Sequence, residues 1–477
     1  MSRASVVIVG GGIAGLSAAW ELTGAKDGPD DNSPRVEVIE AERLVGGALR
    51  TMQFAGRTID LGPDGFLARR PEAVQLIGEL GCTEELEAID ASGATIWLRG
   101  ALHELPTGLV LGIPTSSGQL AAVQGLSFRA RLDAARDQRV PVRMNVGDDA
   151  TIGDIVRTKL GRELAYQFIE PMVGGIQAGR IDQLSAKSVF PALLVAAQKG
   201  GSLMKAMRPM TSGAPEATGP IFNSLLEGVG SLPVELAEQL RGRGVVIRTG
   251  VAVTALRRTP SGNYPWEVDT ASTTTPADVV VLATPAPTVA RLLGSLDPPL
   301  ERLSSIPSAG AAIITFSVPR NAITLSAVGT GVLVPLGTAW TGEGSMMVTA
   351  LTFLDRKWPH LRSNDDVLLR AHVGRIDDER WAQMSDEELT ERVASEMRVL
   401  LPRFEDTFSS VVQRWPAGLP QYYLGHDTMV TNAKAAAAAI RVALCGNAYD
   451  GVGIPASIGS GRRAGRNALD MIRDVAH

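Results

Sequence analysis

The apolar residues at the start of the chain predict a strand, a helix and a second strand. Residues 5–9 form a compact β-branched run, and residues 16–23 carry apolar side chains at helical spacing. Residues 25–34 are rich in turn-forming residues, and residues 35–40 resume a strand pattern. Together these segments predict one parallel βαβ unit.

The middle of the chain predicts a helical insert followed by a second unit of strands and helices. A hairpin is expected over 95–105 with its turn at Gly100, and residues 116–220 have the apolar spacing of a helical insert. Helices are expected at 118–137, 151–170, 186–207, 227–241 and 386–401, and strands at 245–248, 251–256, 277–284, 311–317 and 346–352. Near the end we expect a strand at 442–446, a glycine-rich loop to Gly461 and a final helix over 462–475.

Composition narrows the class of protein without identifying it. The 477 residues suffice for two or three packed units, and no apolar run approaches the roughly 20 residues that span a bilayer. A net charge of -5 disfavours nucleic acid as a partner. Two cysteines and five histidines, without ligand spacing, predict no metal site. The apolar run at 6–10 is too short for a signal peptide, so a cytoplasmic protein is expected.

A glycine turn supplies the first candidate site. Gly10, Gly12 and Gly15 form Gly-x-Gly-x-x-Gly between a predicted strand and the helix after it. The second glycine lets the backbone approach a pyrophosphate, and the helix N-terminus offers unpaired N–H groups to its charge. Glu40 ends the second strand, where its carboxylate would accept hydrogen bonds from a ribose. A glycine turn in an unrelated α/β protein and a solvated Glu40 are the alternatives.

The next segment resembles a known group of flavoproteins. Arg43-Leu-Val-Gly-Gly47 and Arg50-Thr51 are similar to the sequence after the acidic residue in FAD enzymes of the glutathione-reductase-like second group. That group includes amine oxidases, phytoene desaturases and protoporphyrinogen oxidases, so the resemblance implies FAD rather than NAD. Paired glycines let the backbone pass close to a ligand, and Arg43 would neutralise phosphate charge. An ordinary turn beside a surface arginine is the alternative.

Longer segments resemble the protoporphyrinogen/coproporphyrinogen oxidase family in its bacterial form. Residues 60–66, Asp-Leu-Gly-Pro-Asp-Gly-Phe, and residues 446–455, Gly-Asn-Ala-Tyr-Asp-Gly-Val-Gly-Ile-Pro, are similar to the two flavin-facing segments of that family. Three further stretches resemble it in the same order: 105–114, 170–179 with Leu184-Ser185, and 414–422 with Gly425-His426. The resemblance spans nearly the whole chain.

This resemblance implies an α/β fold class with three domains. These are an FAD-binding Rossmann-like domain of the glutathione-reductase-like second group, an α+β substrate domain and a helical insert. The expected boundaries are 1–74, 221–288 and 438–477 for the FAD-binding domain, 89–110 and 289–437 for the substrate-binding domain, and 111–220 for the helical domain.

The motifs and the family together predict the residues that bind FAD. The glycine turn is expected to hold the pyrophosphate, Val253 to touch the adenine, and the dipole of the last helix to stabilise the reduced flavin. The full expected set is Gly10, Gly12, Ile13, Ala14, Gly15, Glu40, Arg43, Gly46, Gly47, Ala48, Gly62, Pro63, Asp64, Val253, Thr284, Gly446, Val452, Gly453 and Ile454.

The chain also departs from the family pattern. Position 177 is Gln where many relatives have Tyr, so a ring-stacking role there is absent. Pro455-Ala-Ser457 stands where many relatives read Pro-Asp-Cys, and Cys445 is expected at the end of a buried strand. We therefore expect FAD to be bound without a covalent bond.

The family implies oxidation of a porphyrinogen to a porphyrin, with hydride transfer to the flavin, reoxidation by oxygen and release of hydrogen peroxide. The cofactor supplies the chemistry, and no catalytic side chain is assigned. Coproporphyrinogen III, a substrate of haem biosynthesis, is favoured over protoporphyrinogen IX because no strongly apolar membrane-docking stretch is present. The candidate substrate contacts are Ile176, Gln177, Arg69, Arg70 and Lys357, the last three for carboxylates unless they are solvated surface charges.

Several alternatives remain at this point. An amine oxidase or a carotene desaturase would share the nucleotide-binding half, and a binding protein like the prenyl-Rab escort proteins would lack flavin. Residues 128–143 carry five arginines, at 129, 131, 136, 139 and 143, and would touch a bilayer if they do not form a solvated helix face. The oligomeric state is not predicted.

Overall fold

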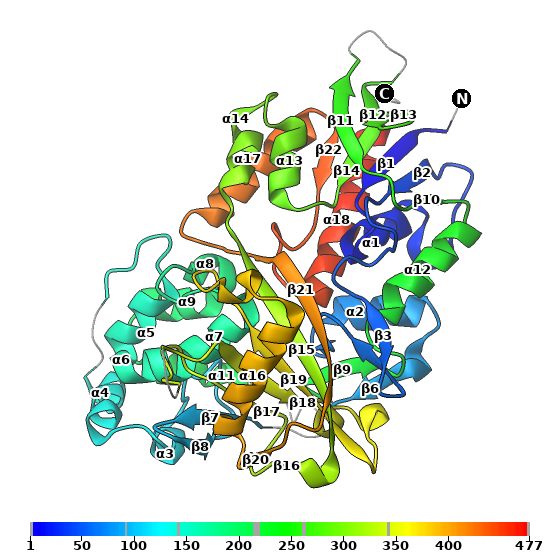
Figure 1. Cartoon of the computed structure of the whole chain (residues 1–477). Helices are drawn as coiled ribbons and strands as arrows, with labels where there is room; N and C mark the ends of the chain where they lie inside the picture. The colour runs from blue at the N-terminus through cyan, green and yellow to red at the C-terminus, as the bar shows by residue number, and fades with distance from the viewer. Residues whose placement is uncertain are drawn as a thin grey trace.

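The computed structural model describes residues 3–90, 93–140, 144–212, 220–259, 264–340 and 344–474. Figure 1 shows three parts: a unit at the upper right that holds both ends of the chain, a helical unit at the lower left, and a large sheet at the lower centre.

A five-stranded parallel sheet joins the two ends of the chain. Its order is β10 (Val246–Arg248), β2 (Arg35–Ile39), β1 (Ser5–Val9), β14 (Val279–Leu282) and β22 (Val442–Leu444). Val6 pairs with Val36 on one side and with Val279 on the other, and Val280 pairs with Val442. Since residues 6–9 of β1 and all of β14 are buried valine, isoleucine and leucine residues, both faces of the sheet must be covered.

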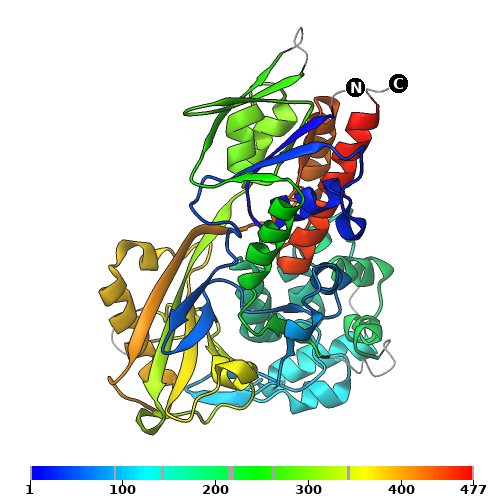
Figure 2. The same cartoon turned by 90° about the vertical axis from the view of Figure 1, so that its right-hand side faces the viewer.

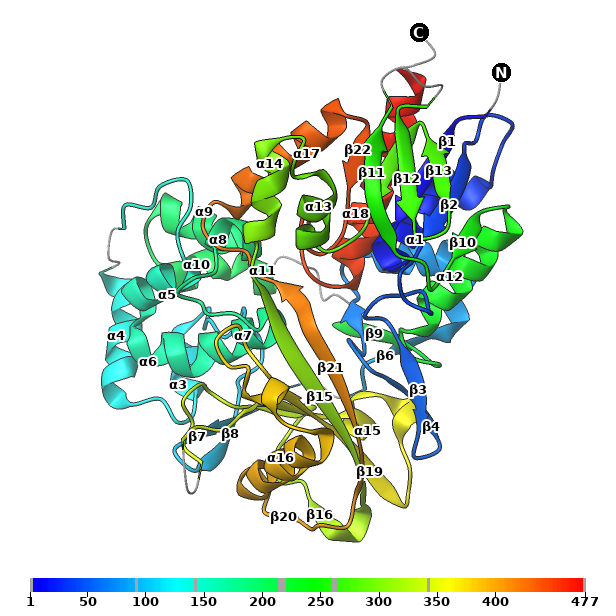
Figure 3. The ribbon, with the colours of Figure 1, turned by 45° about the horizontal axis from the view of Figure 1, so that its top comes forward.

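Helices cover one face of this sheet, and a smaller sheet with further helices covers the other. On the first face lie α1 (Ile13–Leu22), α2 (Pro71–Glu79), α12 (Ser231–Gly242) and α18 (Ile454–Arg473). On the second lie the antiparallel strands β11 (Val253–Arg258), β12 (Trp266–Thr270) and β13 (Thr274–Ala277), with α13 (Ala286–Leu293), α14 (Pro298–Glu301) and α17 (His426–Ala439) (Figure 3). Successive residues of β1 point into opposite cores, as the period of a strand requires.

The last helix packs directly on the first, as Figure 2 shows for the red and blue segments. A Cβ added at Gly461 would lie 2.0 Å from the carbonyl oxygen of Ala14, and one at Gly465 would lie 2.8 Å from that of Ala18. The predicted end of the loop at Gly461 is wrong, because helix α18 already begins at Ile454. Its glycines pack against α1 instead of forming a turn. Residue 475, the predicted end of this helix, lies outside the described residues.

A seven-stranded sheet forms the second unit. Its order is β21 (Ser409–Pro420), β15 (Ser308–Pro319), β19 (Asp366–Val373), β18 (Val348–Phe353), β17 (Gly331–Leu333), β7 (Thr95–Leu98) and β8 (Ala101–Glu104). The predicted hairpin is confirmed as β7 and β8. The amphipathic helix α16 (Asp386–Leu400) covers one face through Leu389, Val393 and Met397. The strands β19 and β21 were not predicted, because Arg370 and Arg414 interrupt their apolar pattern.

Short strands connect the two units. These are β3 (Thr51–Phe54), β4 (Arg57–Asp60), β5 (Phe66–Leu67), β6 (Leu86–Ala88) and β9 (Phe222–Leu225). The loop between β4 and β5 is the predicted flavin-facing segment.

The helical insert is confirmed, but its helices are shorter than predicted. They are α3 (Ser117–Ala122), α4 (Phe128–Arg139), α5 (Ile152–Leu160), α6 (Arg162–Leu164), a π-helical turn (Ala165–Ile169), α7 (Glu170–Gln177), α8 (Ala186–Val189), α9 (Pro191–Lys199), α10 (Leu203–Met207) and α11 (Pro209–Ser212). The predicted helix at 118–137 divides because Gly125 has φ +74° and Ser127 caps α4 by accepting from the N–H of Ala130.

The contact between the first and last helices gives a stability prediction. Gly461→Ala places a methyl group on the Ala14 carbonyl oxygen, so we expect the free energy of unfolding to fall by about 2 kcal/mol, the usual cost of overpacking. Gly242→Ala in α12 is the control, because a Cβ there meets nothing within 4 Å. Thermal unfolding of the two flavin-free variants makes the comparison. Equal melting temperatures would contradict the tight contact.

Candidate active site

The predicted glycine turn lies where β1 ends and α1 begins. Gly10 has φ +106°, and a Cβ there would lie 2.7 Å from the carbonyl oxygen of Ala283. A Cβ on Gly15 would lie 2.0 Å from the carbonyl oxygen of Gly10. By contrast, a Cβ on Gly12 would meet nothing within 4 Å. Two of the three glycines are therefore required for packing, whereas Gly12 borders open space.

The second glycine pair lies beside the first. The N–H of Gly46 donates to the carbonyl oxygen of Gly11 at 2.9 Å, and Gly46 forms a parallel bridge with Gly12. A Cβ on Gly47 would come no closer than 3.7 Å to the Gly12 Cα. Helix α1, with the predicted contacts Ile13 and Ala14 in its first turn, has no side-chain cap at its N-cap, Gly12. Uncapped N–H groups facing an open backbone cradle are the arrangement that fits a pyrophosphate.

The other residues predicted near the nucleotide surround this turn. One carboxylate oxygen of Glu40 accepts from the Gly11 N–H at 2.6 Å and the other from the Glu42 N–H at 2.8 Å. Val253 is buried at the start of β11, whereas Arg43 is exposed. Thr284 follows β14, and its buried hydroxyl has no hydrogen-bond partner among the described residues. An unpaired buried hydroxyl at this edge is a place where a bound nucleotide fits.

The flavin-facing loop at 60–66 is held by side chains of the large sheet. A Cβ on Gly62 would lie 2.2 Å from the carbonyl oxygen of Ala48, so this loop packs on the segment after Gly47. The buried guanidinium of Arg370 donates to the carbonyl oxygens of Asp60 and Gly62. The indole N–H of Trp415 donates to the carbonyl oxygen of Leu61 at 3.1 Å. Three consecutive carbonyl groups of the loop are thus fixed, and Pro63 remains exposed.

Two predicted residues, Asp64 and Lys357, pair with each other. The ammonium of Lys357 lies 2.8 Å from an Asp64 oxygen, each side chain is only 17% exposed, and the indole N–H of Trp358 donates to the same carboxylate. Burial alone would raise the pKa of Asp64, but the charges of Lys357 and Arg370 outweigh it and hold that pKa far below its usual value. The ammonium of Lys357 therefore already has a partner inside the protein.

The second flavin-facing segment, 446–455, follows β22 and leads into α18. Gly446 donates its N–H to the Ser460 hydroxyl at 3.1 Å, and Lys434 pairs with Asp450 at 2.7 Å. Gly453, with φ +102°, is the N-cap of α18, and the buried Ile454 is its first residue. Val452, the remaining predicted contact, is half-buried just before this cap. The N-terminus of this 20-residue helix, which carries a partial positive charge, therefore lies at the predicted flavin contacts.

A cavity of about 280 Å³ lies where these segments meet the large sheet. Its walls include Ala48, just after the second glycine pair, Asn447 and Ala448 from the second flavin-facing segment, and Ser308 and Trp415 from the strands β15 and β21. The two ends of the chain and the large sheet therefore border one space, as binding of a single cofactor requires.

The structure separates the predicted substrate contacts. Ile176 is 53% exposed at the end of α7, whereas the next residue, Gln177, is buried. Arg69 is exposed, and Arg70 pairs with Glu72 at 2.7 Å on the surface. No hydrogen bond or ion pair among the described residues connects these residues with Lys357. Binding of a substrate carboxylate by Arg69, Arg70 or Lys357 therefore stays a prediction.

Sequence reasoning did not identify two titratable residues of β19. Arg370 is 1% exposed, and His372 lies two residues further on the same face of the strand. Burial, together with the charge of Arg370, lowers the pKa of His372 to about 4, so its imidazole is neutral. A charged residue and a histidine within the otherwise apolar run Val367–Val373 were the available signal.

Comparison with known proteins defines the class. Residues 13–469 match the family described as flavin containing amine oxidoreductase, and the chain belongs to this family. It is accordingly an FAD-dependent oxidoreductase, so the predicted fold class and cofactor are confirmed.

Several relatives similar over almost the whole chain are porphyrinogen oxidases. The chain is 32% identical over 477 residues to a coproporphyrinogen III oxidase of Bacillus subtilis, covering 98% of both proteins. It is 31% identical over 479 residues to a coproporphyrinogen III oxidase of Mycobacterium tuberculosis, covering 99% of both. A crystal structure from Exiguobacterium sp. 255-15, described as a "putative protoporphyrinogen oxidase", is 30% identical, covers 99% of this chain and 100% of its own, and has a TM-score of 0.85. The resemblance stated from the motifs is thereby confirmed.

The open position of Gly12 gives a prediction about the cofactor. Gly12→Val adds a side chain whose Cβ meets no atom within 4 Å and which extends into the cradle, so we expect a folded protein that does not retain FAD. Gly15→Val is the contrast, because its side chain would collide with the Gly10 carbonyl and disturb the fold itself. Absorbance near the flavin bands and far-UV circular dichroism separate the two outcomes. A yellow Gly12→Val protein would refute the placement.

The ion pair between Asp64 and Lys357 gives a pH-dependent prediction. Lys357→Met leaves a buried carboxylate without its ammonium, so we expect a loss of roughly 2 to 3 kcal/mol at neutral pH. The depressed pKa of Asp64 stabilises the native protein above the unfolded pKa of about 3.9, and this contribution is lost as the pH falls. In the variant Asp64 readily takes up a proton, so the difference from the parent should shrink on acidification. Urea unfolding at several pH values measures it, and a difference that does not change with pH would contradict the assignment.

Proposed function

We propose that this oxidoreductase converts coproporphyrinogen III to coproporphyrin III in haem biosynthesis, with oxygen as the electron acceptor and hydrogen peroxide as the second product. The proposal rests on similarity at about 30% identity to several coproporphyrinogen III oxidases over almost the whole chain. The match covers the flavin-facing segments and also the sheet and helices around the cavity. The region that would select the substrate is therefore included in the similarity to the coproporphyrinogen III oxidases.

In this proposal, bound FAD supplies the oxidising group, and the protein supplies orientation and a dry site. Backbone N–H groups at the α1 N-terminus and the carboxylate of Glu40 would hold the nucleotide. Arg370 and Trp415 hold the 60–62 loop in one conformation beside the cavity. The N-terminus of α18 would favour negative charge on the reduced cofactor. The neutral imidazole of His372 would offer a hydrogen-bond acceptor on β19, the strand that also carries Arg370.

We infer that FAD is held without a covalent bond. Cys445 is fully buried, and burial raises the pKa of its thiol to about 12, so a thiolate is not formed near neutral pH. Cys82 lies just beyond α2 and is partly buried, where burial also raises its pKa.

Protoporphyrinogen IX is the second candidate substrate. A protoporphyrinogen oxidase of Bos taurus is 27% identical over 488 residues and covers 98% of both chains, which is a weaker likeness than that to the coproporphyrinogen oxidases. The four propionates of coproporphyrinogen would require cations at the rim of the site, and we propose Arg69 and Arg70 as their partners. Lys357, the third predicted cation, would first have to give up its pair with Asp64. Ile176 and Gln177 are proposed to line the slot for the macrocycle.

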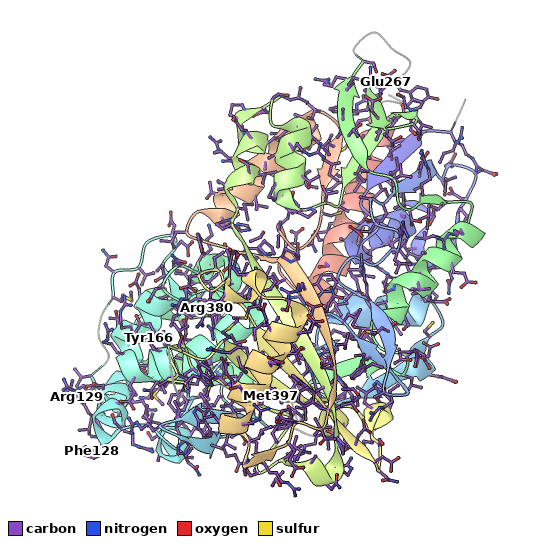
Figure 4. All side chains as sticks on the ribbon, in the orientation of Figure 1. Phe128, Arg129, Tyr166, Glu267, Arg380 and Met397 are labelled. Carbon is purple, nitrogen blue, oxygen red and sulfur yellow. The ribbon has the colours of Figure 1, made fainter. Side chains whose placement is uncertain are left out.

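A peripheral contact with a membrane is proposed at helix α4, on an otherwise cytoplasmic protein. Phe128 is 76% exposed at the start of this helix, Val140 is 75% exposed just after its end, and Figure 4 shows Phe128 and Arg129 at the outer edge of the helical unit. Arg131 is not available for lipid, because it donates to the carbonyl groups at 120–126, and residue 143 lies outside the described ranges. None of the helices in the described part of the chain combines the length and apolar character of a membrane span.

An aerobic assay of the purified, flavin-loaded protein tests the proposed function. With coproporphyrinogen III we expect porphyrin fluorescence to appear together with hydrogen peroxide, because six electrons pass from each macrocycle to oxygen. Protoporphyrinogen IX should give a lower kcat/KM. Gly12→Val is the flavin-free control and corrects for spontaneous oxidation. Flavin bleaching by amines, with no reaction of either porphyrinogen, would assign the chain to amine oxidation instead.

A further inference from the structure

The segments 414–426 and 446–455 meet at two neighbouring side chains, Gln421 and Tyr422, that the proposed chemistry does not use. Gln421 and Tyr422 follow the end of β21, and both are almost completely buried, at 1% and 2% exposure. We propose that this dipeptide is a positioning pair in which Tyr422 holds the flavin-facing loop and Gln421 holds the helix that borders the substrate slot.

The hydroxyl of Tyr422 forms hydrogen bonds with two residues of the flavin-facing loop 446–455. It donates to the carbonyl oxygen of Asn447 and accepts from the N–H of Gly451 at 3.1 Å. One hydroxyl thus connects the first part of the loop with the residue just before Val452. Its ring stacks on His426, with centroids 4.1 Å apart and planes 15° apart. Burial lowers the pKa of His426 to about 4, so this stack is between two neutral rings.

Gln421 makes the corresponding contact with the helical unit. Its side-chain N–H₂ donates to the carbonyl oxygen of Gln177 at 2.7 Å and to that of Leu419 at 3.0 Å. Two carbonyl acceptors fix which end of the amide is nitrogen. A Cβ on Gly179 would lie 2.2 Å from the Gln421 Oε1, so only glycine admits the amide here. The end of α7, with Ile176 and Gln177, is therefore held from β21.

The backbone of the dipeptide is fixed as well. The N–H of Gln421 donates to the carbonyl oxygen of Pro307, and the carbonyl oxygen of Tyr422 accepts from the N–H of Ser185, both at 2.8 Å. The two side chains therefore bond to different parts of the protein from one fixed stretch of backbone, Tyr422 to the flavin-facing loop and Gln421 to the end of α7. Each contact can be removed without removing the other.

The hydroxyl of Tyr422 is tested with Tyr422→Phe in the flavin-loaded protein. The Asn447 carbonyl and the Gly451 N–H lose a buried partner, so we expect release of FAD to be about tenfold faster, as for the loss of one or two hydrogen bonds. The absorption bands of the bound flavin should shift, and kcat should fall with KM nearly unchanged. Stopped-flow flavin fluorescence after dilution into mild urea measures the release.

Tyr423→Phe is the matched control, because it removes the same group one residue further on. Within the described ranges, the hydroxyl of Tyr423 donates only to the side chain of Gln183, at 3.0 Å. We expect this variant to keep the parental flavin release, spectrum and turnover. If Tyr422→Phe and Tyr423→Phe do not differ in flavin release and spectrum, the positioning role of Tyr422 is refuted.

Gln421→Met tests the other arm. It removes the donor to Gln177 in a side chain of similar volume, and we expect KM for coproporphyrinogen III to rise roughly fivefold while flavin release stays parental. The KM measurement on Gln421→Met rests on the proposed function, whereas the measurement of flavin release does not. A parental protein that oxidises no porphyrinogen would overturn the proposed function and leave the test of Tyr422 intact. Faster flavin release in Gln421→Met, or an unchanged KM, would overturn the division of roles.

Discussion

The contact of helix α18 on helix α1 is the interaction on which the rest of the structure depends. Gly461 and Gly465 let the last helix approach the carbonyl groups of Ala14 and Ala18, and β22 joins the same sheet as β1. This places the residues before α18 beside the glycine turn before α1, although more than 400 positions separate them in the chain. The predicted flavin contacts come from both ends, so the proposed site is complete only once both ends have packed.

The second constraint is that the large sheet holds the loops around this cradle. Arg370 and Trp415 fix three carbonyl groups of the 60–62 loop, and Tyr422 fixes the other loop. A loop carbonyl group that loses its water and finds no other hydrogen-bond donor raises the free energy of the folded protein. Arg370, Trp415 and Tyr422 provide such donors. These bonds offset part of the cost of burying Arg370, and removing the guanidinium would leave the carbonyl groups of Asp60 and Gly62 without their donors.

The sequence allowed the nucleotide-binding half to be predicted because its physical requirements are local. A glycine turn, a strand end and a helix start are read from neighbouring residues, and Gly10, Gly12 and Gly15 lie as those rules demand. The start of α18 was misplaced because Gly459 and Gly461 indicate a turn in sequence, whereas in the fold they are contact points for another helix. Arg370 and Trp415 bond to a loop more than 300 positions earlier in the chain, and Tyr422 bonds to residues 25 and 29 positions later. No spacing rule connects such partners.

The predicted cations differ in how readily each would meet a substrate carboxylate. The pair of Arg70 with Glu72 lies at the surface, with the Arg70 side chain 48% exposed, and surface pairs contribute about 0 to 1 kcal/mol, so a propionate would displace Glu72 at little cost. Lys357 is different, because its pair with Asp64 is mostly buried, and separating a buried pair costs several kcal/mol. A propionate at Lys357 would have to leave Asp64 without its partner beside the flavin-facing loop. The exposed arginines after that loop, Arg69 and Arg70, are therefore better placed for anionic arms, and Lys357 is better explained as a structural cation that fixes the loop.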